Sequence, residues 1–375
     1  MERFGECEIL NLTSVVKSGK LSPFYQSPLG GGWVQTFEKD FGEYHNSKNA
    51  IAVSSGTAAL HISLLSLGIG KNDEVIVPPL SFVATASAVL MAGAKPVFCD
   101  VDKETYNIDP KKIEECITKK TKAIIPVHLL GNPCDMEKIM DIANSHGLFV
   151  IEDCAQSLGA SIRCKLVGTF GHMSIFSFQE TKTITTLGEG GMILTYSPLF
   201  ADKCRAIRNH AEKYFSAMFL GYNYRMTEAQ AAFGLAQMSK LNYFNSIQKE
   251  NAEYLIRKLP KGVKPQKVRE GCDSSYFIIG CTLEDDELLS SRDEIINKLI
   301  EKGIHKTQPG ASVSKGYSEL ISDLPLFKKY KAKVPTAKKL LPKFLWFDIH
   351  RWKEPEKFKE DVEVVLEVLE TVRNK

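Results

Sequence analysis

The chain has 375 residues, of which 43% are hydrophobic and 25% charged, and its formal net charge is +3. This composition is typical of a globular protein of two or three domains, and the small charge without a dense Lys/Arg block argues against nucleic acid. The N-terminus lacks the apolar core of a signal peptide, and no apolar run is long enough to span a bilayer. Nine scattered cysteines show no Cys-x-x-Cys spacing, so we expect reduced thiols, no metal site and a cytoplasmic location.

Short apolar runs rich in Val and Ile alternate with helical stretches between about residues 50 and 200. Several runs lack apolar/polar alternation, as expected for strands that are buried on both faces. We expect strands at Glu74–Val77, Pro96–Cys99, Ala123–Val127, Leu148–Ile151, Ser174–Phe178 and Gly191–Thr195. Helices are expected between them at Thr57–Leu67 and Asp135–His146. The repetition predicts an α/β domain with a mostly parallel sheet.

Beyond about residue 225 the pattern becomes helical, and a second, smaller α+β unit follows. A capping box at Ser291–Glu294 predicts a helix start. The expected elements are helices at Thr227–Lys240, Tyr243–Lys258, Ile295–Lys302 and Glu356–Arg373, and a strand at Ser275–Thr282. We expect a large domain over residues 1–250 and a small C-terminal domain over residues 251–375. Residues 1–30 are expected to pack on the small domain or on a partner.

Small and hydroxylated residues, Ser54-Ser-Gly-Thr-Ala-Ala59, follow the apolar stretch Ala50–Val53 and open a helix. Gly56 allows close approach of the backbone, and the free N–H groups with the Thr57 hydroxyl can bind an anion. A plain helix cap is the alternative. The string lacks the end of a P-loop and the three glycines of a dinucleotide fingerprint, which argues against a nucleotide-dependent dehydrogenase.

Two carboxylates, Glu152 and Asp153, end the apolar run that begins at Leu148. Ligands of open α/β sheets bind at the carboxyl ends of the strands. A buried carboxylate is costly there unless it meets a cation or several donors, and a protonated pyridine nitrogen is one such cation. Asp153 could instead cap the following turn. Gln156, three residues on, could reach a nearby oxygen.

One lysine, Lys182, lies in a Ser/Thr/Gly-rich loop just past a predicted strand. Because Ser177 and Phe178 point to opposite faces of that strand, Ser177 could face a ligand phosphate while Phe178 packs. Gly188, with the glycines at 190 and 191, lets the chain turn back tightly. Most lysines are solvated surface residues, but one in such a loop can hold an aldehyde cofactor as a Schiff base.

Two further segments carry side chains suited to a ligand. Phe82 follows the strand that ends at Val77, where an aromatic ring can lie on a planar cofactor or simply join the core. The string Gly221-Tyr-Asn-Tyr-Arg-Met226 can bind an anion or form a plain surface loop. A phosphate cradle, an acid, a lysine and an aromatic on one sheet are the four functions that pyridoxal phosphate needs.

The order of these strings resembles the sugar aminotransferases of the DegT/DnrJ/EryC1/StrS family. The similarity runs from about Gly32 to the final helix, and its most specific pieces are Ser55–Leu60, Glu152–Gln156, Phe176–Lys182 with Gly188–Gly191, and Gly221–Met226. The resemblance implies the type I fold of pyridoxal-phosphate-dependent transferases. That fold is α/β, with a large domain whose mostly parallel seven-stranded sheet lies between helices, and a smaller C-terminal α+β domain.

The resemblance also implies roles at the cofactor ring. Lys182 would bind pyridoxal 5'-phosphate covalently and move the proton between the substrate carbon and the cofactor carbon. Asp153 would pair with the pyridinium nitrogen. Phe82 would stack on the ring, and Gln156 would lie by its face near the phenolic oxygen.

The cofactor phosphate has its own implied contacts. Gly56, Thr57 and Ser177 would hold it, with Ser55 in the same cradle. Asn223 looks like the family residue that reaches the phosphate of the neighbouring protomer. The working unit would therefore be a homodimer with shared sites, or a tetramer.

The implied reaction moves an amino group in two stages, from an amino acid, usually L-glutamate, to a keto-sugar. The keto-sugar is commonly a nucleotide-linked 4-keto-6-deoxy sugar, in the biosynthesis of amino sugars and surface polysaccharides. A dehydratase branch of the family has His where Lys182 stands, so the lysine favours transamination. The alternative from another class is a non-catalytic regulator that binds pyridoxal phosphate or a sugar on the same fold.

Three segments depart from common family forms, namely Ser157-Leu158, Gly303–Gly310 and Leu345–Trp352. They leave the cofactor residues unchanged and bear on the sugar substrate. Within them, His305, His350 and Arg351 are candidates for a substrate pocket or for plain surface.

Overall fold

The largest unit of the protein is a seven-stranded sheet. The structure is a computed structural model, and it describes residues 2–47, 49–211, 219–304, 312–348 and 355–373. Its strand order is β1-β9-β8-β5-β4-β2-β3. The strands are β1 (Ala50–Val53), β2 (Glu74–Val77), β3 (Lys95–Phe98), β4 (Thr121–Ile124), β5 (Phe149–Asp153), β8 (Met173–Ser177) and β9 (Gly191–Leu194). Only β9 runs antiparallel to its neighbours, so the expected mostly parallel seven-stranded sheet is confirmed.

Alternate residues of each strand pack into two apolar cores on opposite faces of this sheet. Ile151 lies in the first core, which the helices α3 (Gly56–Ser66), α4 (Ala84–Met91) and α7 (Pro198–Arg208) cover. Val150 lies in the second core, with α2 (Gly32–Tyr44), α6 (Met136–His146) and α9 (Glu228–Met238). The short helix α5 (Pro110–Ile113) also lies on this face, against α6. Because successive side chains of a strand point to opposite faces of the sheet, Asp153 lies on the same face as Ile151, and Glu152 points to the opposite face.

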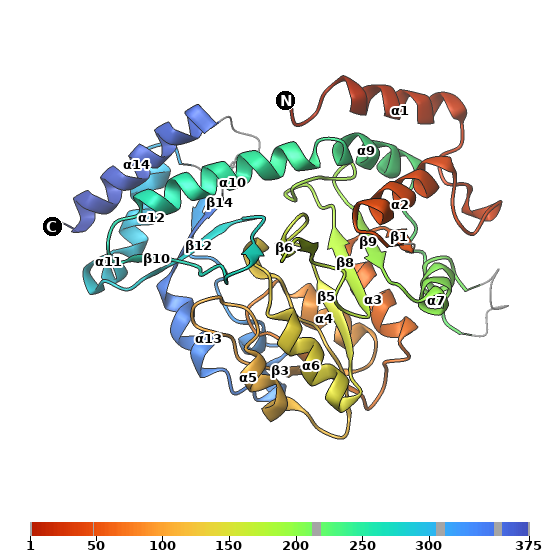
Figure 1. Cartoon of the computed structure of the whole chain (residues 1–375), viewed down its shortest axis with the longest axis horizontal. Coiled ribbons are helices and arrows are strands. Elements are labelled where there is room, and N and C mark those ends of the chain that lie inside the picture. The colour runs from red at the N-terminus through yellow and green to blue at the C-terminus, as the bar shows by residue number, and fades with distance from the viewer. Residues whose placement is uncertain (1, 48, 212–218, 305–311, 349–354, 374–375) are drawn as a thin grey trace.

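A second, antiparallel sheet has the order β10-β12-β14-β13. Its strands are β10 (Val263–Pro265), β12 (Ile279–Leu283), β13 (Ser312–Ser314) and β14 (Phe344–Asp348). A third core joins this sheet to α10 (Leu241–Lys258), α11 (Asp286–Ser290), α12 (Arg292–Glu301) and α14 (Pro355–Arg373). Figure 1 shows these C-terminal helices gathered on one side of the molecule. The exact domain boundary at residue 250 stays a prediction.

Part of the C-terminal half returns to the large sheet. Leu320, Phe327 and Leu340 belong to the first core, and α13 (Pro335–Leu340) is anchored there. The anchor is Asp100, whose carboxylate accepts from the Thr336 and Ala337 amides at 2.8 and 2.9 Å. A third small sheet, of β6 (Ser161–Ile162), β7 (Lys165–Leu166) and β11 (Cys272–Asp273), links the two halves of the chain a second time.

The N-terminal helix α1 (Glu6–Ser18) lies against α9, as Figure 1 shows. The Asn11 side chain donates to the Ala232 carbonyl at 2.9 Å, and the Phe4 and Phe233 rings lie 5.5 Å apart. Within the chain, α1 thus packs on the large domain, and not on the small one as expected, because the buried Glu8 accepts from the Gln237 and Lys240 side chains. Contact of residues 1–30 with a partner stays a prediction. None of the described helices has the length and apolar character needed to cross a membrane.

The helix signals at Asp135 and Gly147 are confirmed, and the one at Ser291 is not. Asp135 caps α6 by accepting from the Lys138 amide, and Gly147 ends the helix in the left-handed region. The capping box at Ser291 is wrong, because α11 runs directly into α12 there and the Ser291 side chain makes no cap hydrogen bond. The strand expected from Ser275 begins at Ile279 instead, since residues before it contact the Gly131 turn.

Candidate active site

The carboxyl ends of β1, β2, β5 and β8 meet at one edge of the large sheet, because these strands run in the same direction. The residues singled out in the sequence follow those ends. They are Ser55, Gly56 and Thr57 after β1, Phe82 after β2, Asp153 and Gln156 at β5, and Ser177 and Lys182 at β8. The fold therefore brings these candidates to the edge where ligands of α/β sheets bind.

The segment after β1 forms a tight cradle with β8 and β9. The Ser55 hydroxyl caps α3 by accepting from the Ala58 amide at 3.1 Å. The amides of Gly56 and Thr57 occupy the first helical positions, which have no acceptor within the helix. A Cβ on Gly56 would lie 2.9 Å from the Ser177 Cβ, and one on Gly191 would lie 2.5 Å from the Ser55 carbonyl. The glycines thus let the backbones pack closely at the positive end of α3, whose free amides can bind an anion.

Asp153 is a buried carboxylate that accepts two hydrogen bonds. Its Oδ2 accepts from the Thr85 hydroxyl at 2.9 Å and its Oδ1 from the Ala155 amide at 3.1 Å. Burial raises the pKa of Asp153, while the bonds from Ala155 and Thr85 and the charge of Lys182 lower it, and the net shift is upward. The ionised form of such a buried carboxyl is stabilised by a nearby cation. Thr85 was missed in the sequence, although it lies one helical turn after Ser81, whose hydroxyl it contacts at 2.9 Å.

Lys182 is held by a folded-back loop. The Phe178 amide donates to the Gly190 carbonyl and the Glu180 amide to the Gly188 carbonyl, both at 2.9 Å. The lysine Nζ lies 4.6 Å from the centre of the Phe277 ring and close enough to Asp153 to lower the pKa of its carboxyl. The loop thus directs the amine toward the buried acid. Phe277, from the C-terminal half, carries no local signal that would have revealed it.

Gln156 is fixed at both ends of its amide. Its Oε1 accepts from the Leu130 amide at 2.8 Å, and its Nε2 donates to the Tyr317 hydroxyl at 3.1 Å. Tyr317 was also missed in the sequence. It lies far along the chain, and only the tertiary fold brings it to β5.

Two predicted residues lie at the surface of this edge. Phe82 is 61% exposed, which leaves its ring open to a ligand. Asn223 is exposed, in a segment that the Ser54 amide ties to the start of α3 by donating to the Tyr224 carbonyl at 2.9 Å. Its reach to a partner stays a prediction. His305, His350 and Arg351 lie outside the described residues.

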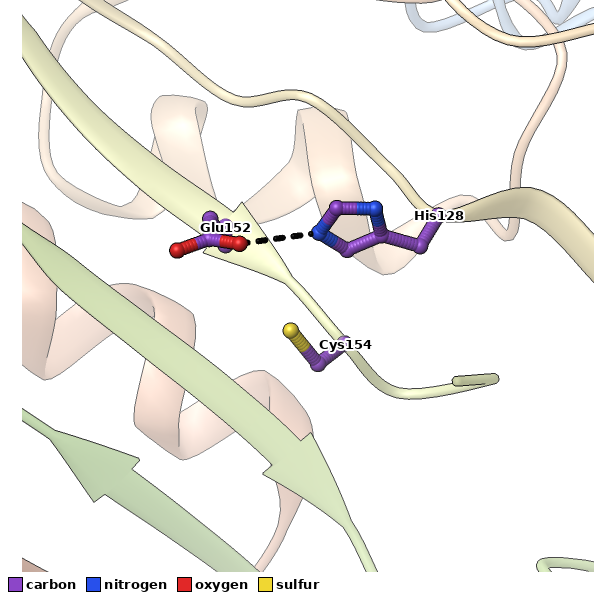
Figure 2. A group of neighbouring side chains, drawn as sticks. All are labelled: His128, Glu152 and Cys154. Carbon is purple, nitrogen blue, oxygen red and sulfur yellow. Dashed lines mark hydrogen bonds and ion pairs between the residues drawn. The ribbon is translucent and has the colours of Figure 1, made fainter. Parts of the chain in front are cut away.

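Figure 2 shows a second cluster on the opposite face of β5, formed by His128, Glu152 and Cys154. The His128 Nδ1 accepts from the Cys134 amide at 3.0 Å, so the proton sits on Nε2, which donates to Glu152 at 3.1 Å. Burial raises the pKa of the Cys154 thiol well above its ordinary value, which keeps it protonated. Both ring nitrogens of His128 are already in hydrogen bonds, and a protonated thiol is a poor metal ligand. The cluster is therefore better suited to holding the structure together, as a structural anchor, than to binding a metal.

The anchor works through Glu152, which has no exposed surface. Its Oε1 accepts from the Phe170 and Gly171 amides at 2.7 and 2.6 Å, and its Oε2 from the Gly168 amide at 2.8 Å. Burial alone would raise the pKa of Glu152, but the hydrogen bonds from His128 and from the backbone amides lower it overall. This ties the loop before β8 to β5 and fixes the place of the neighbouring Asp153.

Glu152→Gln is expected to lower the free energy of unfolding by about 3 kcal/mol at pH 7, because the amide NH2 would face donors. The folded pKa lies below the ordinary 4.5, so the stabilisation is present above pH 4.5 and is lost as pH falls through the folded pKa. Urea unfolding of both proteins across this range checks the prediction. Glu137→Gln, at an exposed glutamate, is the matched control. If Glu152→Gln is as stable as wild type at pH 7, Glu152 does not stabilise the fold as described.

The site fits pyridoxal phosphate on the geometry of the chain alone. Asp153 is a buried acid short of a cation, the Gly56 and Gly191 contacts leave a cradle that a Cβ would fill, and Phe82 offers an exposed ring. Lys182 lies beside them. Together these supply the acid, anion site, aromatic and amine that the cofactor requires.

Comparison with known proteins decides the family. A model of the DegT/DnrJ/EryC1/StrS aminotransferase family matches residues 5–369. The GDP-perosamine synthase of Escherichia coli O157:H7 is 43% identical over 277 residues, which cover 72% of this chain and 75% of that protein. The chain belongs to this family.

Solved structures of aminotransferases superimpose closely on this chain and agree with the family assignment. An aminotransferase from Psychrobacter cryohalolentis superimposes with a TM-score of 0.90 at 32% identity, covering 99% of this chain and 98% of that one. NtdA from Bacillus subtilis, with bound cofactor PMP, gives a TM-score of 0.84 at 30% identity, covering 97% and 81%. The type I fold, the cofactor and the role as a sugar aminotransferase, all implied by the resemblance, are confirmed.

Proposed function

We propose that this aminotransferase moves an amino group from L-glutamate to a 4-keto-6-deoxy sugar carried on a nucleoside diphosphate. The observation that carries the proposal is Lys182 held beside the buried Asp153 at the edge of the sheet, next to the glycine cradle. The similarity to a GDP-perosamine synthase supports GDP as the nucleotide. Amino-sugar and surface-polysaccharide biosynthesis is the setting that such a product implies.

Each site residue has a proposed part in the reaction. Pyridoxal phosphate, when bound, supplies the electron-withdrawing ring that makes the substrate C–H acidic. Asp153 keeps a proton on the ring nitrogen, since its carboxylate gains from a cation there. Lys182 Nζ anchors the cofactor, then takes the proton from the substrate carbon and returns it to the cofactor carbon. Phe82 would stack on the ring, and Gln156 would lie by the face of the ring near its phenolic oxygen.

The phosphate has proposed contacts from two protomers. The Gly56 and Thr57 amides and the Thr57 and Ser177 hydroxyls hold it within one chain, and Ser55 shapes the loop. Asn223, which is exposed, reaches the site of the other protomer, so the active unit is a homodimer or a tetramer. The cytoplasmic location and the lack of a nucleic-acid partner stay predictions.

Single-turnover spectroscopy tests the proposed donor and acceptor separately. L-glutamate is expected to bleach the visible band of the loaded protein, and a nucleotide-linked 4-keto-6-deoxy sugar is expected to restore it. A panel of GDP-, UDP- and dTDP-linked keto-sugars identifies the acceptor. A regulator that only binds cofactor or sugar would leave the band unchanged with L-glutamate, and a dehydratase would restore no band with the keto-sugar. Either result would overturn the proposal.

A further inference from the structure

Tyr317 reaches the edge of the large sheet from the C-terminal half of the chain. Its hydroxyl accepts a hydrogen bond from the Gln156 Nε2 at 3.1 Å, and the Asp153 charge is close enough to raise the pKa of its phenol. Its ring packs edge-on against Trp346, with the centroids 5.2 Å apart. Tyr317 thus lies among the cofactor residues although no sequence signal pointed to it.

The hydrogen-bond direction at Tyr317 follows from the other end of the glutamine. A backbone N–H must meet an acceptor, so the Leu130 amide at 2.8 Å fixes the Gln156 oxygen on that side. The Gln156 nitrogen is therefore the group that faces Tyr317, and it can only donate. Tyr317 accepts this bond, and its own proton is left for another acceptor. Within the described part of the chain, the structure shows no acceptor for that proton.

The phenol keeps this proton throughout the physiological range. Burial raises the pKa of Tyr317 well above its ordinary value, and the Asp153 charge adds to the shift. Tyr317 is therefore a neutral donor and not a base. The hydroxyl is part-buried, and a donor without an acceptor there costs free energy, which a ligand oxygen placed there would recover.

We propose that Tyr317 donates a hydrogen bond to a hydroxyl oxygen of the sugar substrate and so helps to select it. This inference rests on the proposed function and names a residue that the sugar meets. A neutral phenol matches a neutral sugar hydroxyl, whereas the carboxylate of an amino acid is best met by a cation.

The surroundings of Tyr317 fix the position of its ring. Trp346, which packs against its ring, lies in β14 and is 4% exposed. Gly316, in the left-handed region at a φ of 74°, brings the chain so close that a Cβ would lie 2.7 Å from the Trp346 ring. The Tyr317 side chain is therefore held in place beside Gln156.

The test compares two amine donors on the loaded full-length protein. L-glutamate and GDP-perosamine, the amino sugar named for the Escherichia coli relative, both bleach the visible band if both half-reactions run. In Tyr317→Phe, the apparent second-order rate constant for GDP-perosamine is expected to fall about tenfold, as for one lost hydrogen bond. The rate constant for L-glutamate is expected to stay within about twofold.

Tyr330→Phe is the matched control, because it removes a hydroxyl from a tyrosine that packs on Phe327 near β3. It is expected to leave both rate constants unchanged. Unchanged rate constants in Tyr317→Phe would overturn the inference. An equal fall for both donors would also overturn it, since the hydroxyl would then act on Gln156 and the cofactor.

A binding measurement separates this inference from the proposed function. If the wild type reacts with neither donor, the proposed function fails. The affinity for GDP-mannose, an unreactive nucleotide-linked sugar, is then measured by calorimetry in wild type and in Tyr317→Phe. An affinity about tenfold weaker in Tyr317→Phe supports the sugar contact, and an equal affinity contradicts it.

Discussion

Lys182→Ala is expected to remove the visible band of the loaded protein and to lower kcat by roughly 10³-fold or more. The amine is proposed as both anchor and proton carrier, and Lys182 is the only lysine in the loop between residues 178 and 190. Absorbance spectra and steady-state assays with L-glutamate and the keto-sugar check both effects. A variant that keeps the band and its rate would contradict the assignment.

Two controls sharpen the Lys182 experiment. Lys39→Ala, at an exposed lysine that pairs with Glu43 at 3.7 Å, is expected to behave as wild type. Lys182→Arg keeps the charge but cannot supply a neutral amine, so it should be as inactive as the alanine variant.

The same variant tests whether sites are shared. Mixing refolded Lys182→Ala with Asn223→Ala should restore activity, because a mixed dimer holds one site with both residues intact. No recovery, with mixed dimers present, would show that Asn223 does not act across the interface.

Asp153→Asn is expected to lower kcat by roughly 10² to 10³-fold while leaving the fold intact. The amide has the shape of the carboxyl and can still accept from Thr85, but it carries no charge to hold a proton on a ring nitrogen. Steady-state kinetics and circular dichroism measure the two effects. Thr85→Val, which removes the hydroxyl but keeps the carboxylate, should cost far less activity.

The raised pKa of Asp153 adds a stability test to the kinetic one. A folded pKa above the unfolded value means that ionisation costs stability as pH rises through the folded pKa. At pH 7, cofactor-free Asp153→Asn should therefore be at least as stable as wild type. The loaded variant should lose part of the thermal stabilisation that the cofactor gives to wild type. A cofactor-free variant that is much less stable would make Asp153 a structural residue like Glu152.

The sheet and its ligand edge were predictable because they depend on local signals. Buried strands such as Glu74–Val77 read as continuous apolar runs, and Ser177 and Phe178 alternate between the two faces as a strand requires. Asp153 and Lys182 each follow a predicted strand, and the two strands, β5 and β8, are neighbours in the sheet. The same local reasoning failed at Ser291, where the preceding helix sets the backbone.

The rest of the site depends on contacts between distant segments. Phe277 and Tyr317 reach Lys182 and Gln156 only through the packing of the C-terminal half, and no spacing in the sequence encodes that approach. Glu152 and Asp153 are adjacent carboxylates with opposite shifts in pKa. The sequence could not assign those shifts, because the count of backbone donors at each is a property of the fold.

Borohydride reduction of the pyridoxal-phosphate-loaded protein, followed by peptide mass spectrometry, tests the central claim most directly. Reduction fixes the cofactor to whichever amine holds it. The account predicts a pyridoxyl group on Lys182 and its absence from that peptide once L-glutamate has been added first. A label on another lysine, or no label in a protein that binds the cofactor, would contradict it.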